Sequence, residues 1–430
     1  MQYFYTIAFI CFLVSANSQT RSLQYSPPLV PGSPEANGIS TERLKLIDQM
    51  IQEEIDSGHI PGAVALIARN GKIVYHKAFG MADNQANRKL ERDEIFRIAS
   101  QSKAITSTAV MMLWEKGLFR LDDPISKYLP EFGKAQLLES FNEADSSFTT
   151  TPAEKQITIR HLLTHTSGIG YGVIDGDEKF RKIYAKAGVM DLFTVEDITI
   201  QESVKRLAKL PLHHEPGSKY TYSEGLDVLG YFIEVMSGMP FDEFLREHIF
   251  DPLDMDDTWF YLPESKYDRL VTVQRKDDNG QWEPLPYTFY DPDYPRKGAK
   301  KFFSGGAGLS STVEDYAKFL QMYLNNGEYN GKRLLSRTTV EFMMQNQVGE
   351  LLGDRGSDYG LAFGLVDEKG EAGGGRGSFG TFDWGGYFNT QYFADPEENI
   401  IGLIFKQTSG GTGDQTSWKF RQLVFNSIDD

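Results

Sequence analysis

Apolar residues recur every three or four positions from Leu44 to Ile55. This spacing places them on one face of an α-helix. The stretch Ser40–Arg43 before them carries a helix-capping signal, and Gly58 and Pro61 after them stop a helix. The pattern therefore predicts a helix that begins at Ser40.

Two runs rich in β-branched and other apolar residues follow this helix, at Gly62–Ala68 and Lys72–Phe79. Arg69, Asn70 and Gly71 separate them, and an Asn-Gly pair is typical of a tight hairpin turn. The chain is therefore expected to open with a helix and two paired strands.

The pattern between Phe96 and Leu352 is mostly helical, with connections rich in Pro, Gly and Asp. The helical period is clearest at residues 100–116, 226–236 and 313–324, and it returns in a last helix at 417–428. Strand patterns reappear near the end of the chain, at residues 362–366, 388–394 and 400–406. These elements predict an α/β (α+β) fold, in which an antiparallel sheet built from both chain ends is flanked by helices and a helical region is inserted.

The composition is that of a globular protein and argues against one class of partner. Of the 430 residues, 40% are hydrophobic and 13% aromatic, which is ample for a large core. The formal net charge is −16. Because nucleic-acid binding depends on Lys and Arg side chains that neutralise phosphates, we expect no nucleic-acid partner.

The first residues have the pattern of an export signal. The apolar run Ile7–Val14 is too short to span a bilayer, and the small residues of Ser15–Ser18 follow it. Residues 1–18 are therefore interpreted as a secretory signal peptide, and the mature chain as periplasmic or extracellular, without a transmembrane span. The single cysteine, Cys11, lies inside this segment, so disulfides and thiolate catalysis are not expected after its removal. Residues 19–39 show no periodicity and predict an extended lead-in.

Two familiar kinds of catalytic site are excluded by missing residues. The pentapeptide Gly-x-Ser-x-Gly of the common α/β serine hydrolases is absent. His161 and His165 have the spacing of a zinc helix, but a leucine stands where the general-base glutamate belongs. The histidines are therefore interpreted as packing residues, and no metal or cofactor is expected.

One remaining motif can carry nucleophilic chemistry. Ser100 and Lys103 open a predicted helix, and their three-residue spacing puts the ammonium beside the hydroxyl on one helix face. The positive potential at a helix N-terminus favours a developing alkoxide.

Two further motifs supply groups that such a nucleophile needs. Tyr222 lies in the segment Pro216–Glu224, and a tyrosine beside a lysine can accept a proton where the cation lowers the tyrosine pKa. Trp384, Gly385, Gly386 and Tyr387 stand at the predicted start of a strand, where two glycines let the backbone approach a ligand closely.

In this order, the three motifs resemble those of the serine β-lactamase-like superfamily, which includes class C β-lactamases, D-alanyl-D-alanine carboxypeptidases and related esterases. The stretches 60–63, 157–168 and 304–312 are also similar to that superfamily. The resemblance implies a β-lactamase-like serine hydrolase domain over residues 40–430. It also implies that Ser100 is the acylated nucleophile, Lys103 its activator and Tyr222 the proton shuttle. The backbone N–H groups of Ser100 and Tyr387 would form the oxyanion hole.

Two departures from the superfamily pattern bear on the substrate. β-Lactamases of this type begin the third motif with Lys and end the second with Asn, whereas this chain has Trp384 and Glu224. Without that Lys, and with a carboxylate added, an anionic substrate is disfavoured. Trp-Gly-Gly resembles the esterase branch, so Trp384, Gly385, Gly386 and Glu224 are expected to contact a neutral substrate.

The sequence therefore predicts a secreted serine hydrolase that forms an acyl-enzyme on small-molecule carboxylic esters. Amide hydrolysis of the β-lactamase, D-aminopeptidase or DD-carboxypeptidase type is an alternative, and a non-catalytic ligand sensor of the same fold is a second. The oligomeric state and the choice between Lys103 and Tyr222 as general base stay open.

An aromatic cluster in the helical region has two interpretations. Tyr287, Phe289, Tyr290 and Tyr294 lie in a segment rich in Pro and Asp. They would either wall an apolar acyl or sugar pocket or pack a loop, and loop packing is favoured.

Overall fold

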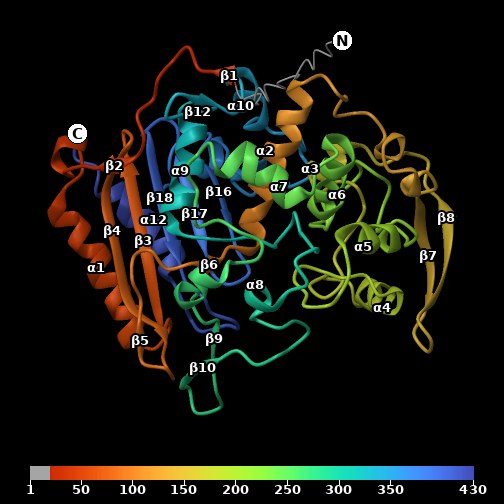
Figure 1. Cartoon of the computed structure of the whole chain (residues 1–430), viewed down its shortest axis with the longest axis horizontal. Coiled ribbons are helices and arrows are strands. Elements are labelled where there is room, and N and C mark those ends of the chain that lie inside the picture. The colour runs from red at the N-terminus through yellow and green to blue at the C-terminus, as the bar shows by residue number, and fades with distance from the viewer. Residues whose placement is uncertain (1–19) are drawn as a thin grey trace, which may run out of the picture.

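A nine-stranded sheet joins the two ends of the part of the chain that the structure describes, residues 20–430. In this computed structural model the strand order is β14-β15-β16-β17-β18-β3-β4-β2, with β5 beside β4. The pairings are antiparallel except for that of β2 with β4. The predicted antiparallel sheet from both chain ends is therefore confirmed (Figure 1). The predicted signal peptide lies outside the described residues.

The strands of this sheet are β2 (Val30–Pro31), β3 (Gly62–Arg69), β4 (Lys72–Asp83), β5 (Arg88–Lys89), β14 (Ser357–Tyr359), β15 (Gly364–Val366), β16 (Phe382–Gly385), β17 (Gln391–Asp395) and β18 (Ile400–Phe405). The predicted hairpin is formed by β3 and β4. Asn70 and Gly71 at its tip have φ angles of 54° and 72°, which is the left-handed conformation that a tight hairpin turn requires.

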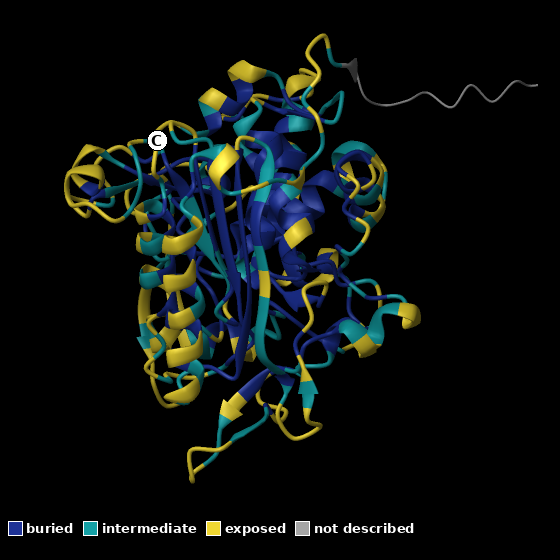
Figure 2. Ribbon diagram, turned by 90° about the vertical axis from the view of Figure 1, so that its left-hand side faces the viewer, coloured by how far each residue is buried: buried dark blue, intermediate teal, exposed yellow. Residues whose placement is uncertain are grey.

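Helices cover both faces of the sheet. On one face α1 (Thr41–Asp56) and α12 (Thr416–Asn426) pack side by side, and Ile47, Phe420 and Val424 are among the side chains they bury against the strands. On the other face lie α2 (Ser102–Glu115) and α9 (Val313–Leu324). Figure 2 shows the central strands in the buried colour and the outer helices with exposed residues on their solvent side.

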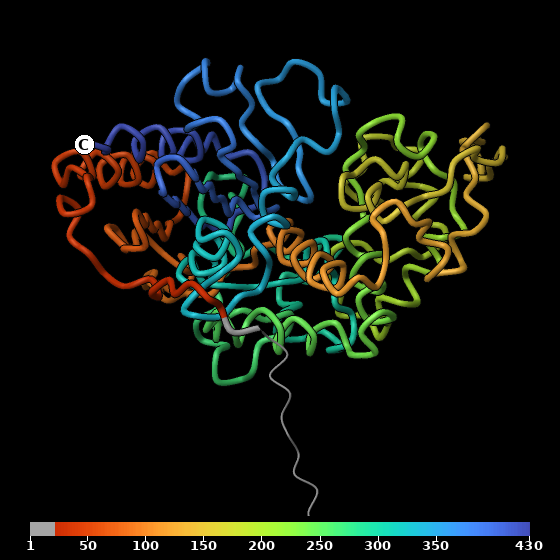
Figure 3. The backbone as a smooth tube through the Cα atoms, turned by 90° about the horizontal axis from the view of Figure 1, so that it is seen from above, coloured from red at the N-terminus to blue at the C-terminus, as the bar shows by residue number. Residues whose placement is uncertain are grey.

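The middle of the chain forms a helical region beside the sheet, which Figure 3 shows in yellow and green. Its helices are α3 (Ile159–Leu163), α4 (Glu178–Ala187), α5 (Ile200–Leu207), α6 (Gly225–Ser237), α7 (Phe241–Leu245) and α8 (Tyr294–Lys297). The later helices α10 (Arg337–Met343) and α11 (Glu368–Ala372) precede the last strands. Short strand pairs outside the main sheet are β1 (Thr20–Arg21) and β12 (Glu328–Tyr329) with β13 (Lys332–Arg333), β6 (Phe96–Arg97) with β11 (Ser310–Ser311), β7 (Gln136–Asn142) with β8 (Ser147–Pro152), and β9 (Gln274–Lys276) with β10 (Trp282–Pro284).

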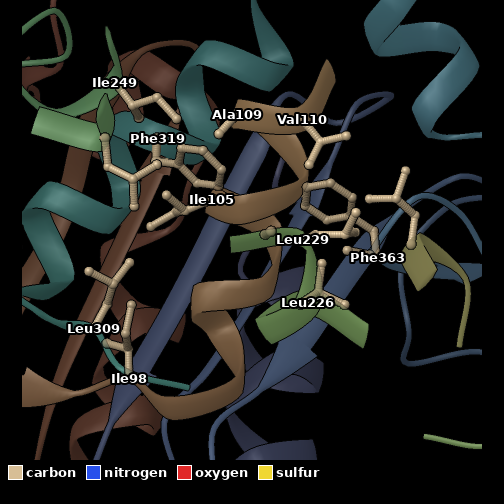
Figure 4. Close-up of a cluster of buried hydrophobic side chains, with 14 of the residues drawn as sticks. Ile98, Ile105, Ala109, Val110, Leu226, Leu229, Ile249, Leu309, Phe319 and Phe363 are labelled. Atoms are coloured by element: carbon tan, nitrogen blue, oxygen red, sulfur yellow. The ribbon is translucent and has the colours of Figure 1, made fainter. Parts of the chain in front are cut away.

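The core is continuous from the sheet into the helical region through α2. Figure 4 shows Ile105 and Ala109 of α2 among side chains of α6 and α9, such as Leu226 and Phe319. Nearly every residue of α2 is buried, as expected for a helix that is apolar on all sides. The N-terminal end of α2 and the turn before it, which carries Ser100, are therefore held at the boundary between the sheet and the helical region.

Two predictions about the ends of the strands β16 and β17 were wrong. Trp384 and Gly385 end β16 rather than begin a strand, and β17 starts at Gln391 rather than at residue 388. The chain turns between them, because the Gly386 N–H donates to the Thr390 carbonyl at 2.7 Å and Asn389 has a φ of 66°.

The β7–β8 hairpin was not predicted. Most of its side chains are exposed, and they show no alternation of buried and exposed positions.

Candidate active site

Ser100 lies in a single 3-10 turn, Ala99–Gln101, that leads into α2. The α-helix itself begins at Ser102, two residues later than predicted. Ala99 has a φ of 43°, a strained conformation for a residue with a side chain, of the kind found at functional sites. Hydrogen bonds of Ile98 N–H to the Leu309 carbonyl (3.0 Å) and of Leu309 N–H to Ser102 Oγ (3.1 Å) fix the turn on both sides.

The three predicted catalytic side chains meet at one oxygen atom. The Tyr222 hydroxyl donates to Ser100 Oγ at 2.7 Å, and Lys103 Nζ donates to the same atom at 3.2 Å. Lys103 is fully buried and also donates to the Gly306 carbonyl at 2.7 Å. Its ammonium lies 4.7 Å from the ring centroid of Tyr222 and 5.5 Å from that of Tyr171. Both proton-accepting candidates are therefore in direct contact with the nucleophile.

Asp227 of α6 binds Gly306, the residue whose carbonyl accepts from Lys103. Asp227 Oδ1 accepts hydrogen bonds from Ser304 Oγ at 2.5 Å and from the Gly306 N–H at 3.2 Å. The pKa of Asp227 is raised by burial, against which the Ser304 hydroxyl and the Lys103 ammonium act. The sequence analysis did not single out Asp227. The similarity of residues 304–312 to the superfamily indicated the segment that Asp227 contacts, but not Asp227 itself.

His165 holds the segment that carries Tyr222. The Thr221 N–H donates to the His165 carbonyl at 2.8 Å, and the Ser223 N–H donates to His165 Nδ1 at 3.1 Å. Both peptide neighbours of Tyr222 are thus bound to one residue, whose ring also lies 4.6 Å from the Tyr222 ring. Burial and the Lys103 charge lower the pKa of His165 well below its usual value, so Nδ1 stays an acceptor. His165 packs as predicted, and it also positions Tyr222.

The segment after β16 lies directly against the nucleophile turn. A Cβ on Gly386 would collide with Thr390 Oγ1 and lie 2.5 Å from the Ile98 carbonyl oxygen. Only glycine therefore permits this approach, which places the residue before Tyr387 against the start of the turn that carries Ser100. Ser100, Tyr222, Trp384, Gly385 and Gly386 line one cavity of about 480 Å³.

The structure does not bring Glu224 into the lining of this cavity. Its side chain is buried and hydrogen-bonded to Asp191, whose carboxylate also accepts N–H groups of Gly172 and Val173. Burial and the Asp191 charge raise the pKa of Glu224 well above its usual value. Burial therefore favours the neutral form of Glu224, and its side chain lies outside the lining of the cavity.

The aromatic cluster divides between packing and exposure. Tyr290 and Tyr294 are buried against Phe193, as the loop-packing interpretation expected. Tyr287 is 66% exposed and Phe289 38% exposed.

Among residues 20–430, no group of three or more His, Cys, Asp or Glu side chains is arranged to hold a metal ion. Within the same range, none of the helices combines the length and apolar character needed to cross a membrane.

Comparison with known proteins identifies the family. A family model described as Beta-lactamase matches residues 47–425. The chain belongs to the β-lactamase family. Esterase EstB of Burkholderia gladioli is 31% identical over 387 residues, which cover 84% of this chain and 90% of that protein. Protein Rv1367c of Mycobacterium tuberculosis (strain ATCC 25618 / H37Rv) is 32% identical over 371 residues, which cover 83% and 88%.

A solved structure agrees with this assignment. EstCE1, described as a hydrolase with promiscuous acyltransferase activity, matches with a TM-score of 0.75 at 28% identity, over 90% of this chain and 98% of that chain. The predicted β-lactamase-like fold and family are confirmed, and this member of the β-lactamase family is a serine hydrolase.

Replacement of Gly386 by alanine tests the close approach of the segment after β16 to the turn that carries Ser100. We expect Gly386→Ala to lower kcat about a hundredfold or more, because the added Cβ moves the segment that carries the Tyr387 N–H, the predicted oxyanion donor, away from the turn of Ser100. We also expect it to destabilise the fold by about 1–3 kcal/mol. Gly411→Ala is the matched control, since Gly411 lies outside the cavity lining and its Cβ would meet nothing within 4 Å. Thermal denaturation and ester kinetics check both variants, and equal tolerance of alanine at the two positions would contradict the geometry.

Because burial favours the neutral form of Glu224 and the side chain lies outside the cavity lining, Glu224→Gln should leave kcat/KM for a neutral ester within about threefold. A carboxyl whose pKa is raised on folding favours the native state below its usual value of 4.5, and this contribution is lost as the pH rises through the folded pKa. The Tm of Glu224→Gln relative to wild type should therefore increase from pH 5 to pH 8. The exposed Glu350 serves as the control in Glu350→Gln. A difference that shrinks with pH would refute the neutral state.

Two substitutions of His165 distinguish a role in positioning Tyr222 from a role in packing alone. Asn tolerates the left-handed backbone of this residue, φ 55°, and its Oδ1 can replace Nδ1 as the acceptor of the Ser223 N–H. Leu removes that acceptor. We expect His165→Leu to lower kcat at least tenfold with KM little changed and to alter the pH profile of kcat, whereas His165→Asn keeps most of the activity. Equal losses in both variants would show that His165 acts only through packing.

Proposed function

We propose that the protein is an esterase that forms an acyl-enzyme on Ser100. The observation that carries this proposal is the convergence of the Tyr222 hydroxyl and the Lys103 ammonium on Ser100 Oγ, at 2.7 and 3.2 Å. Both are within the hydrogen-bond reach that a general base requires. The same three side chains stand in the superfamily motifs, and the relative EstB is named an esterase.

In the first half of the reaction, the Tyr222–Lys103 pair acts in the form that carries one proton fewer than a phenol plus an ammonium. It takes up the Ser100 hydroxyl proton while Oγ bonds to the ester carbonyl carbon. The carbonyl oxygen becomes an oxyanion, and the N–H groups of Ser100 and Tyr387 stabilise it. When the carbonyl re-forms, the bond to the alkoxy oxygen breaks, and Tyr222 returns the proton to that oxygen. The alcohol leaves and the acyl group stays on Ser100.

In the second half, water takes the place of the alcohol. The Tyr222–Lys103 pair removes a proton from the water as its oxygen attacks the acyl carbon, and the proton then returns to Ser100 Oγ. The carboxylic acid leaves and the free serine is restored. The burial of Lys103 supports this role, because its ammonium meets the reacting groups without competition from bulk water.

The charges of the cavity favour neutral esters over anionic lactams. Trp384 occupies the position of the lysine that would attract a substrate carboxylate. The one arginine in the cavity lining, Arg421, is ion-paired with Asp383 at 2.5 Å. No unpaired cation of the described lining is therefore left for an anionic substrate. Amide or lactam hydrolysis by the same three groups is the alternative.

Residues 1–18 have the features of a secretory leader. We therefore place the proposed esterase outside the cytoplasm. Mass analysis of the mature N-terminus after expression with the leader would test this.

The central test is covalent labelling of the purified protein with a fluorophosphonate, followed by intact-mass and peptide analysis. We expect one adduct on Ser100 and steady turnover of a short p-nitrophenyl ester. Ser100→Ala should lose both and stay folded, because alanine fits a helix start. Turnover of a chromogenic cephalosporin in preference to the ester would favour the lactam alternative. A folded wild-type protein without adduct or turnover would favour the ligand sensor.

A further inference from the structure

The cavity at Ser100 continues around the edge of the sheet. Side chains alternate between the two faces of a strand, and the register pairs Asp383 with Phe393 and Gly385 with Gln391. Phe393 belongs to the core beneath α1 and α12, so Asp383 and Gln391 also point to that face. Trp384 points to the opposite face, with Ser100. Since all these residues line one cavity, that cavity reaches from the nucleophile to α12.

This passage exists because β16 has a free edge at its end. The strand β15 pairs with β16 only as far as Asp383, so Trp384 and Gly385 have no neighbouring strand on that edge. Gly385 carries no side chain that would close the gap, and a Cβ there would meet nothing closer than 3.5 Å. A substrate group can therefore pass from the Ser100 face around this edge.

The far part of the cavity is lined by the apolar side chains of Phe393, Ile404 and Phe420 and by polar side chains whose charges are balanced. Arg421 of α12 donates to Asp383 at 2.5 Å and to the Arg376 carbonyl. Gln391 has a buried Oε1 without a hydrogen-bond partner, and the exposed Ser417 lies at the start of α12. Buried polar atoms usually have partners, so the unpartnered Gln391 amide marks a place where a ligand can supply one.

We propose that this far part is a binding subsite for an uncharged polyhydroxyl group, such as a sugar, in the alcohol portion of the ester. The inference rests on the proposed function. Hydroxyl groups both donate and accept, and so match an amide, an Arg–Asp pair and a serine together. An anionic group would meet Asp383, and a wholly apolar group would leave the Gln391 amide unsatisfied.

The alcohol portion, rather than the acyl portion, occupies the subsite because of Tyr222. This residue returns a proton to the leaving oxygen and also lines the cavity. The leaving oxygen therefore lies at the mouth of the cavity, and the rest of the alcohol extends inward past Trp384. A volume of about 480 Å³ is within the range of small-molecule sites and large enough for a sugar ring.

The test compares two acetate esters, p-nitrophenyl acetate and an acetylated methyl glucoside. Both give the same acetyl-enzyme, so a difference in kcat/KM reports on the alcohol. Gln391→Leu should lower kcat/KM for the glucoside ester about three- to tenfold, the usual effect of one hydrogen bond, and leave p-nitrophenyl acetate within twofold. The matched control is Gln422→Leu, on the exposed side of α12, which should change neither.

Two further measurements keep the proposal falsifiable where Gln391→Leu is unstable. Ser417→Tyr adds bulk at an exposed position and should also slow only the glucoside ester. Free methyl glucoside should inhibit p-nitrophenyl acetate hydrolysis competitively, with weaker inhibition in Gln391→Leu.

Parallel losses on both esters, or none on either, would overturn the subsite. A wild-type protein that hydrolyses p-nitrophenyl acetate but not the glucoside ester would overturn the subsite and leave the esterase proposal intact. Absence of turnover together with absence of fluorophosphonate labelling at Ser100 would instead overturn the esterase proposal.

Discussion

The buried ammonium of Lys103 is the constraint on which the rest of the site depends. An ammonium removed from water loses several kcal/mol of solvation unless polar groups replace the water. Here the Gly306 carbonyl, Ser100 Oγ and two tyrosine rings surround it. These groups come from distant parts of the chain, so the helical region must pack correctly against α2 before the lysine is satisfied.

The same requirement explains why the partners of the catalytic side chains are held so closely. Asp227 binds the N–H of Gly306, the residue whose carbonyl accepts from the ammonium, and His165 binds the N–H groups of Thr221 and Ser223 on either side of Tyr222. Gly386 lets the strand end approach the turn before Ser100. Each contact limits the freedom of a reacting group before a substrate arrives. Such preorganisation lowers the entropic cost of reaching the transition state.

Local patterns in the sequence were sufficient for most of the elements but not for the contacts between them. The amphipathic period of α1, the Asn70-Gly71 turn and the Ser100–Lys103 spacing each act over a few residues, and the structure has them close to where they were predicted. The hydrogen bonds of Asp227 and His165 join residues more than fifty positions apart. Nothing in the local pattern of either residue distinguishes such a contact from ordinary packing.

Motif positions predicted the charge of the cavity poorly. The charge of a side chain depends on its surroundings as well as on its residue type. Glu224 stands at a motif position and suggested a negative cavity, yet burial beside Asp191 raises its pKa and it lies outside the lining. Arg421 stands in no motif, yet it lines the cavity, where Asp383 balances it. The cavity is therefore polar without a net charge from this pair, and the alcohols that it favours are those that offer many hydrogen bonds and no charge.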